Sequence, residues 1–299
     1  MLKLNGVFAP LPTSFDQDEN LSLDHMRNNI AKLSQSGLAG FLALGSNGEL
    51  VNLSDDEKQS VYETAREAIP SEKIMLAGTG GQSTRETIKL TKEAAKAGAD
   101  VALVLNPFYF KGAMTREVLV NHYFAVAENS TIPVLIYNMP ANSGLDMDAD
   151  TILAISAHPN IIGMKDSGGN MVKMGDIRHR VKPEFQILAG SASFLLPALT
   201  MGAVGGILAL ANIAPEQCVK IYMSFSEGDL TKALEMQLKM ISINSAVTGR
   251  WGVPALKEAM DYLGYYGGPP RRPMLPVKQE IKDELIKILN ECNIKGVKY

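Results

Sequence analysis

Eight short apolar runs recur along the chain, and they constrain its fold more than any other feature of the sequence. They begin at Gly6, Gly40, Lys73, Asp100, Pro133, Ile161, Phe185 and Gly205. Each run is almost continuously hydrophobic, which is typical of parallel strands covered on both faces. Amphipathic helical stretches lie between the runs, so the sequence predicts an α/β fold of the (β/α)8 TIM-barrel type. A doubly wound sheet usually has fewer strands and a glycine fingerprint after the first, whereas GVFAPLPTSF contains no GxGxxG.

Residues that typically start or end helices divide the chain further. The sequences SDDE at Ser54–Glu57 and STRE at Ser83–Glu86 match the capping box that opens helices, and Gly37 and Gly98 stand where helices should stop. From Pro215 onward helical patterns dominate, interrupted by a turn-rich stretch over 264–276. We therefore expect a catalytic barrel domain over residues 1–225 and a C-terminal helical extension over residues 226–299.

Composition excludes several classes of function. A formal net charge of −3 leaves no basic stripe for nucleic acid, and no apolar run approaches the length of a membrane span. The N-terminus lacks the pattern of a secretory signal, so a cytoplasmic location is expected. The two cysteines form no CxxC, and the four histidines have no metal-ligand spacing. The sequence thus predicts neither a metal site nor a disulfide framework.

Barrel enzymes carry their catalytic residues at the carboxyl ends of the strands. In this chain these positions are poor in carboxylates but hold Lys165, the two tyrosines Tyr109 and Tyr137, and the hydroxyl and amide of Ser46 and Asn47. Apolar surroundings disfavour an ammonium group, so an amine placed there can act as a neutral nucleophile on the ketone of a 2-oxo acid. A phenol such as Tyr137 suits the accompanying proton transfers.

Plainer interpretations of the same residues stay open at this point. Lys165 could be exposed where its strand surfaces, and Tyr137 could be a core tyrosine with a satisfied hydroxyl. Tyr109 could be a packing or subunit-contact aromatic. The GSNG turn at Gly45–Gly48 could be an ordinary turn rather than a set of N–H groups for a substrate carboxylate.

In combination, the motifs GSNGE, NPFYF, YNMP, GMKDS and AGS follow one another in a specific order. In this the chain resembles the dihydrodipicolinate synthase / N-acetylneuraminate lyase superfamily of class I aldolases, over essentially its whole length. The resemblance implies a TIM barrel that forms a lysine Schiff base with pyruvate and uses no metal or organic cofactor. It also implies a homotetramer, a dimer of dimers.

The resemblance assigns roles to individual residues. Lys165 matches the imine-forming lysine and Tyr137 the catalytic tyrosine. Ser46 and Asn47 match the residues that bind the pyruvyl carboxylate, and Ser46 also belongs to a proton relay. Tyr109 matches the aromatic that completes this relay, often in the neighbouring subunit's site.

Further matches concern the rest of the pocket. Gly190 and Ile207 match pocket-lining positions. Asn142 stands where dihydrodipicolinate synthases carry an arginine that engages the aldehyde's carboxylate, and a neutral amide removes that charge and bidentate donor. An asparagine here is expected in the 4-hydroxy-2-oxoglutarate aldolase subgroup. Ser167 and Ser191 then become candidates for contact with polar groups of the substrate.

The leading hypothesis is a class I aldolase that cleaves 4-hydroxy-2-oxoglutarate to pyruvate and glyoxylate. Its partners would be pyruvate and a small aldehyde or 2-oxo acid. Dihydrodipicolinate synthase, which joins pyruvate to aspartate semialdehyde, and an aldolase for 2-keto-3-deoxy sugar acids are the alternatives within the class. A non-catalytic barrel that senses a 2-oxo acid is an alternative from another class, and a phosphate-handling barrel is disfavoured.

Overall fold

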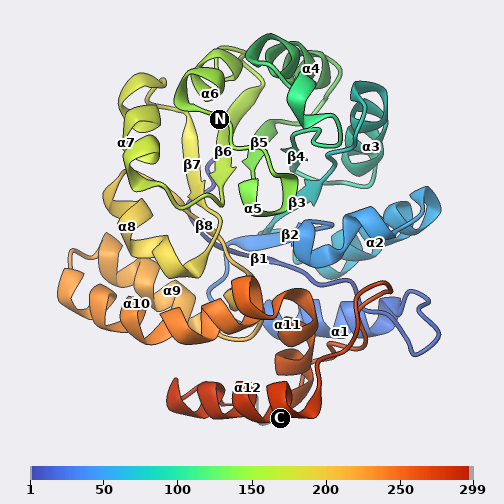
Figure 1. Cartoon of the computed structure of the whole chain (residues 1–299), viewed down its shortest axis with the longest axis vertical. Coiled ribbons are helices and arrows are strands. Elements are labelled where there is room, and N and C mark those ends of the chain that lie inside the picture. The colour runs from blue at the N-terminus through green and yellow to red at the C-terminus, as the bar shows by residue number, and fades with distance from the viewer. Residues whose placement is uncertain (1, 296–299) are drawn as a thin grey trace.

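Eight parallel strands pair in chain order and the last pairs with the first, which closes the sheet into a barrel (Figure 1). The computed structural model describes residues 2–295. Its strands are β1 (Gly6–Pro10), β2 (Gly40–Ala43), β3 (Ile74–Gly78), β4 (Val101–Leu105), β5 (Val134–Asn138), β6 (Ile161–Asp166), β7 (Gln186–Ala189) and β8 (Gly205–Ile207). Each predicted apolar run contains one strand, so the (β/α)8 barrel is confirmed.

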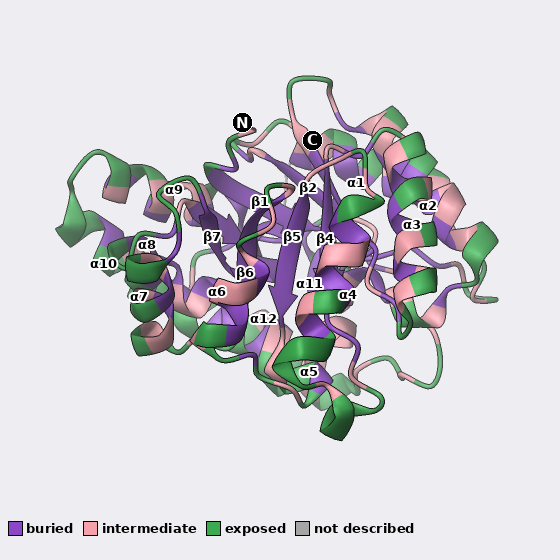
Figure 2. Cartoon of the chain, turned by 90° about the horizontal axis from the view of Figure 1, so that it is seen from above, coloured by how far each residue is buried: buried purple, intermediate pink, exposed green. Residues whose placement is uncertain are grey.

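Helices follow every strand and cover the outside of the barrel, while the strands inside are buried (Figure 2). The covering helices are α1 (Leu23–Leu33), α2 (Asp55–Ala68), α3 (Thr84–Lys96), α4 (Arg116–Glu128), α6 (Ala149–Ile155), α7 (Met171–Arg180), α8 (Leu195–Thr200) and α9 (Pro215–Ser226). Ser54 and Glu57 form the predicted capping box of α2. Gly98 takes a left-handed φ of 94° just after α3, as a helix-terminating glycine does. The prediction for Gly37 was less accurate, because α1 already ends at Leu33.

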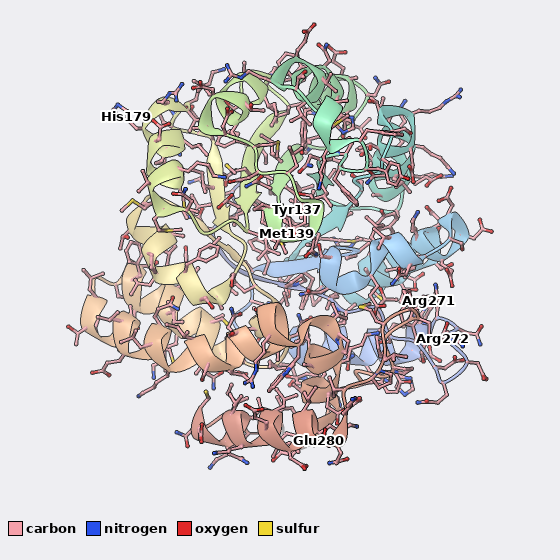
Figure 3. All side chains as sticks on the ribbon, viewed as in Figure 1. Tyr137, Met139, His179, Arg271, Arg272 and Glu280 are labelled. Carbon is pink, nitrogen blue, oxygen red and sulfur yellow. The ribbon has the colours of Figure 1, made fainter. Side chains whose placement is uncertain are left out.

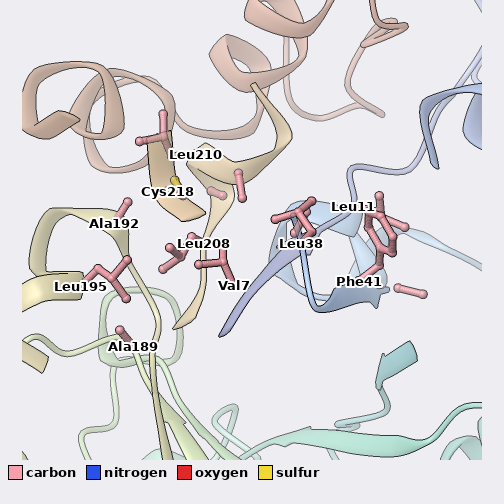
Figure 4. Close-up of a cluster of buried hydrophobic side chains, with 14 of the residues drawn as sticks. Val7, Leu11, Leu38, Phe41, Ala189, Ala192, Leu195, Leu208, Leu210 and Cys218 are labelled. Atoms are coloured by element: carbon pink, nitrogen blue, oxygen red, sulfur yellow. The ribbon is translucent and has the colours of Figure 1, made fainter. Parts of the chain in front are cut away.

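Two apolar cores result from the alternation of side chains along the strands. Phe8 points into the barrel, where it packs with Leu42 and Leu135, whereas its neighbour Val7 packs in the layer between strands and helices. Figure 4 shows part of this outer layer, in which Cys218 of α9 belongs to the same cluster as Val7. Each fully buried aliphatic side chain stabilises the fold by about 1.5–3 kcal/mol relative to an exposed one.

The C-terminal extension consists of α10 (Leu230–Ser245), the π-helix η6 (Ala246–Arg250), α11 (Gly252–Tyr262) and α12 (Gln279–Glu291). It lies along one side of the barrel (Figure 1). Buried Gln237 of α10 accepts from the N–H of Leu196 at 2.9 Å and donates to the carbonyl of Ala192 at 2.7 Å. These bonds join the extension to the segment that follows β7. A boundary at residue 225 stays a prediction, and residues 296–299 of the proposed extension lie outside the described range.

None of the helices in the described part of the chain combines the length and apolarity needed to cross a membrane.

Candidate active site

A cavity of about 520 Å³ opens at the carboxyl ends of the strands. Every predicted site residue except Tyr109 lines it. These residues are Ser46, Asn47, Tyr137, Asn142, Lys165, Ser167, Gly190, Ser191 and Ile207. Figure 3 shows Tyr137 together with Met139, a further lining residue, near the centre of this end of the barrel. Residues from several strand ends therefore converge in one space, as the barrel topology requires.

An irregularity in β6 directs Lys165 into this cavity. The β5–β6 register pairs Val134 with Ile161 but Leu135 with Gly163, so Ile162 is an extra residue on β6. Ile162 faces the barrel interior, whereas Met164 packs in the outer layer and Lys165 lines the cavity. A regular strand would place residues 162 and 165 on opposite faces, and the bulge brings both to the inside.

Tyr137 is the register partner of Lys165 on β5, and both residues are only 4% exposed. The Nζ of Lys165 lies 4.2 Å from the centre of the Tyr137 ring. The Tyr137 hydroxyl lies 3.2 Å from Oγ of Ser46, with either atom able to donate. The amine, the phenol and the serine hydroxyl thus form one continuous polar group.

Opposing effects act on the pKa of Tyr137. Burial alone would raise this pKa, because desolvation disfavours the phenolate. The positive charge of Lys165 and hydrogen bonds with Ser46, Lys165 and Ser167 favour the phenolate, and together they bring the pKa below its ordinary value. A lower pKa makes the phenolate, the form that accepts a proton, more accessible.

A buried polar network holds the ends of β5 and β6 behind these residues. Nδ2 of Asn138 donates to Oδ1 of Asp166 at 2.7 Å and to Oδ1 of Asp146 at 2.8 Å. The backbone N–H of Gly169 donates to Oδ2 of Asp166 at 3.2 Å, and Lys173 pairs with Asp146. Sequence reasoning missed Asn138 and Asp166, although each directly follows a predicted catalytic residue in YNMP and GMKDS.

Gly190 belongs at its position because no side chain fits there. A Cβ atom at Gly190 would lie 2.0 Å from Oγ of Ser167 and 2.7 Å from the carbonyl oxygen of Asp166. Its N–H donates to that same carbonyl at 2.7 Å. The glycine therefore allows β7 to approach the Ser167 segment closely enough for both serines, Ser167 and Ser191, to line the cavity.

The far wall of the cavity comes from the C-terminal extension. Val247, Thr248 and Gly249 of η6 line it, together with Gly252 and Val253 of α11. π-Helical segments are rare and occur frequently at functional sites. The sequence predicts only a helical extension here, because no local signal places this segment against the strand ends.

The same wall supports the serines of β7. Nδ2 of buried Asn244 donates to Oγ of Ser191 at 2.9 Å and to Oγ of Ser193 at 2.7 Å. Thr248 donates its hydroxyl to the carbonyl of Asn244 at 2.5 Å. The orientation of Ser191 is therefore set by the extension.

Lys165 is the sole charged side chain among the described residues that line the cavity. Hydroxyl and amide groups supply the remaining polar contacts, with Asn142 at the predicted position. Within residues 2–295 no three His, Cys, Asp or Glu side chains are grouped so that they could hold a metal ion.

Tyr109 is not brought to the other candidate residues. Its side chain is 76% exposed and packs edge-on against Phe110, with 4.9 Å between ring centroids. The backbone N–H groups of Phe108 and Tyr109 both donate to Oε1 of Gln82. Gln82 and Phe108 line a neighbouring cavity of about 200 Å³, which shares Ser46, Tyr137 and Asn142 with the first. The predicted role of Tyr109 in a neighbouring subunit's site stays a prediction.

A closed parallel barrel with a buried amine, a phenol and a hydroxyl at its carboxyl end is the arrangement of a TIM-barrel enzyme. The profile of the dihydrodipicolinate synthetase family matches residues 3–292, and the chain belongs to this family.

Named relatives agree on the family and differ in substrate. A probable mitochondrial 4-hydroxy-2-oxoglutarate aldolase from Emericella nidulans is 39% identical, with 92% of this chain and 90% of the relative covered. An L-threo-3-deoxy-hexylosonate aldolase from Hypocrea jecorina is 36% identical, with 92% and 91% covered. A 4-hydroxy-tetrahydrodipicolinate synthase from Methanothrix thermoacetophila is 32% identical, with 96% and 97% covered.

A prophage protein of the same family from E. coli K12, solved in complex with pyruvate, superposes with a TM-score of 0.92. It is 29% identical, and the match covers 98% of this chain and all of the other. The chain is accordingly an enzyme, a lyase of this family, and the non-catalytic sensor is set aside.

Proposed function

We propose that the chain is a class I aldolase that cleaves a 4-hydroxy-2-oxo acid to pyruvate and an aldehyde, with 4-hydroxy-2-oxoglutarate as substrate and glyoxylate as the aldehyde. The observation that carries the proposal is the contact of the buried Lys165 amine with Tyr137, whose hydroxyl lies 3.2 Å from Ser46. The name of the Emericella relative supports the choice of substrate.

In the proposed reaction, Lys165 passes one proton to the phenolate of Tyr137 and its amine adds to C2 of the substrate. Tyr137 then returns this proton to the departing hydroxyl group, so that loss of water leaves an iminium ion. Tyr137 removes the proton of the 4-hydroxyl group while the C3–C4 bond breaks, and the electron pair of that bond moves into the iminium to give an enamine. The aldehyde leaves, the enamine is protonated at C3, and water hydrolyses the pyruvyl imine. Ser46 and Asn47 hold the carboxylate next to C2, and Ser46 also hydrogen-bonds the phenol.

In this proposal the remaining lining residues contact the aldehyde part of the substrate or shape the wall beside the imine. Asn142, Ser167 and Ser191 offer polar groups to the leaving aldehyde, while Gly190 and Ile207 shape the wall beside the imine. A neutral Asn142 in this cavity leaves the carboxylate of an aldehyde without an arginine partner, which weighs against aspartate semialdehyde and against glyoxylate alike. The choice of glyoxylate therefore rests on the name of the Emericella relative.

A second candidate is an aldolase for 2-keto-3-deoxy sugar acids, whose aldehyde product is neutral and hydroxylated. The specific observation in its favour is the lining itself, in which hydroxyls and amides stand beside Lys165 without another charge. The name of the Hypocrea relative supports it too.

Borohydride trapping tests the shared chemistry. Reduction in the presence of pyruvate should join the pyruvyl C2 to Nζ of Lys165, with no label in Lys165→Ala and none on the buried Lys257. An unlabelled Lys165 in the wild-type enzyme would refute the Schiff-base proposal. Cleavage of 4-hydroxy-2-oxoglutarate should then exceed cleavage of a 2-keto-3-deoxy sugar acid, and the opposite order would favour the second candidate.

We also propose a cytoplasmic homotetramer, in which exposed Tyr109 contributes to a neighbouring subunit's site. Sedimentation velocity tests the assembly, and a monomer would exclude this role for Tyr109.

A further inference from the structure

A fully buried ion pair joins the GSNGE loop to the C-terminal extension. Nζ of Lys257 on α11 lies 2.8 Å from Oε1 of Glu49, and each side chain is only 1% exposed. Removing two charges from water is unfavourable, and a buried pair of this kind is often no more stabilising than apolar residues of similar volume. The segments that the two residues connect therefore point to a role beyond stability.

Glu49 ends the turn that carries the proposed carboxylate-binding residues. It follows the 3-10 turn η1 (Ser46–Gly48) and has a left-handed φ of 55°, which is uncommon for a residue with a side chain. Its N–H donates to the carbonyl of Ser46 at 3.1 Å. The backbone of Glu49 is thus coupled directly to the orientation of Ser46 and Asn47.

Lys257, the other member of the ion pair, has further contacts of its own. Its Nζ donates to the carbonyl of Pro269 at 2.9 Å and lies 4.5 Å from the centre of the Phe15 ring. Burial lowers the pKa of Lys257, and the nearby carboxylate of Glu49 opposes this effect. The ammonium form of Lys257 is therefore compensated by Glu49.

The segment after α11 makes a second set of hydrogen bonds to the GSNGE loop and the residues that follow it. The backbone N–H of Arg271 donates to Oε2 of Glu49 at 3.0 Å, so both carboxylate oxygens of Glu49 contact the extension. The Arg271 guanidinium donates to the carbonyl of Asn52 at 2.9 Å and to both carboxylate oxygens of Glu57 at 2.8 and 2.6 Å. Figure 3 shows Arg271 and Arg272 beside α2, away from Tyr137.

We propose that Glu49 and Lys257 are positioning residues for the substrate-carboxylate loop, so that the C-terminal extension sets Ser46 and Asn47 through their ion pair. This inference rests on the proposed function of that loop. Neither residue lines the cavity, so each acts through the turn and not on the substrate. Loss of the pair should weaken binding of the 2-oxo acid more than it slows the steps after imine formation.

The decisive variant replaces both charges, Glu49→Leu with Lys257→Met. Apolar residues of similar volume avoid an unpaired buried charge, although the N–H of Arg271 and the carbonyl of Pro269 lose their side-chain partners. This variant should therefore fold, with a melting temperature somewhat below that of the wild type. The pyruvate concentration that gives half-maximal borohydride labelling of Lys165 should rise about tenfold. This is the change in affinity expected when one hydrogen bond to the pyruvate carboxylate is lost. Labelling at saturating pyruvate should be nearly unchanged.

Lys282→Met is the matched control. Lys282 of α12 pairs with Glu258 of α11 at 2.8 Å, yet these side chains are 33% and 23% exposed, and their pair joins two helices of the extension to each other rather than to the loop. This variant should leave the pyruvate dependence unchanged.

Amide hydrogen exchange over residues 45–50 separates this inference from the proposed function, because it needs no substrate. The double variant should exchange faster there, and the control should not. Wild-type exchange and wild-type pyruvate dependence in the folded double variant would overturn the positioning role. If the double variant fails to fold, the same two measurements on Glu49→Gln support or overturn the positioning role in the same way. Absence of labelling in the wild-type enzyme would count against the Schiff base, with exchange alone then deciding the positioning role.

Discussion

Tyr137 and Lys165 are partners across β5 and β6, with the lysine amine 4.2 Å from the centre of the tyrosine ring. Because β6 contains the extra residue Ile162, this pairing requires the bulge: a regular strand that kept Ile161 opposite Val134 would turn Lys165 toward the covering helices. The proposed nucleophile and proton acceptor are therefore placed by sheet register, which is far more rigid than a loop. Rigid placement of reacting groups is what proximity and orientation effects require.

Tyr137→Phe keeps the ring and removes only the hydroxyl. We expect kcat for cleavage to fall about 10²–10⁴-fold, the usual contribution of a general acid–base group. Steady-state kinetics measures this effect. Tyr123→Phe is the control, because its buried hydroxyl donates to the carbonyl of Val104 at 2.9 Å outside the cavity. That change should cost about 1 kcal/mol of stability and leave kcat intact. Equal kcat values for the two variants would rule out the proton-transfer role.

Ser46→Ala should shift the pH dependence of kcat/KM. The phenolate of Tyr137 is the proposed base, so kcat/KM rises with pH through the pKa of this residue in the free enzyme. A hydrogen bond from Ser46 favours the phenolate, and its loss raises the pKa of Tyr137. The rising limb should therefore move to higher pH. Asn47→Ala should weaken substrate binding and leave the pH of the rising limb unchanged. The same shift of the rising limb in both variants would contradict the specific effect of Ser46 on the pKa of Tyr137.

Gly190→Ala tests the close approach of β7 to the Ser167 segment. The added Cβ would meet Oγ of Ser167 at 2.0 Å, so we expect a loss of about 1–3 kcal/mol in unfolding free energy and a sharp loss of activity. Chemical denaturation and kinetics measure the two effects. Gly112→Ala, where no atom lies within 4 Å of the new Cβ, should change neither. Wild-type stability and activity in Gly190→Ala would show that the Ser167 segment can move aside without harm to the site.

Asn142→Arg should change the choice of aldehyde. It adds a second cation to a cavity in which Lys165 is the one charged side chain among the described lining residues, and a hydrogen bond to a charged group contributes about 1.5–3 kcal/mol. In the condensation direction with pyruvate, the preference for glyoxylate or aspartate semialdehyde over a neutral hydroxyaldehyde should rise about tenfold or more. Asn142→Gln, of similar polarity without charge, should leave that preference nearly unchanged. Product ratios from competing aldehydes provide the readout, and an unaltered ratio for the arginine variant would place Asn142 outside the aldehyde subsite.

By itself the sequence determined the eight strands, the barrel they form and most of the cavity lining. The reason is local and periodic: continuous apolar runs are stable only as strands covered on both sides, and the carboxyl ends of parallel strands must meet at one end of a barrel. Residues such as Lys165, Tyr137 and Ser191 could therefore be expected in one place from their positions at strand ends.

Only the tertiary structure decided how these residues are oriented and what supports them. The bulge at Ile162 depends on pairing with β5, and the far wall at Val247–Gly249 depends on how the extension folds back onto the barrel. The ion pair of Glu49 with Lys257 likewise joins two segments far apart in the chain. Such contacts arise when the barrel closes and the extension docks, so the short-range patterns that specify strands and helices do not encode them.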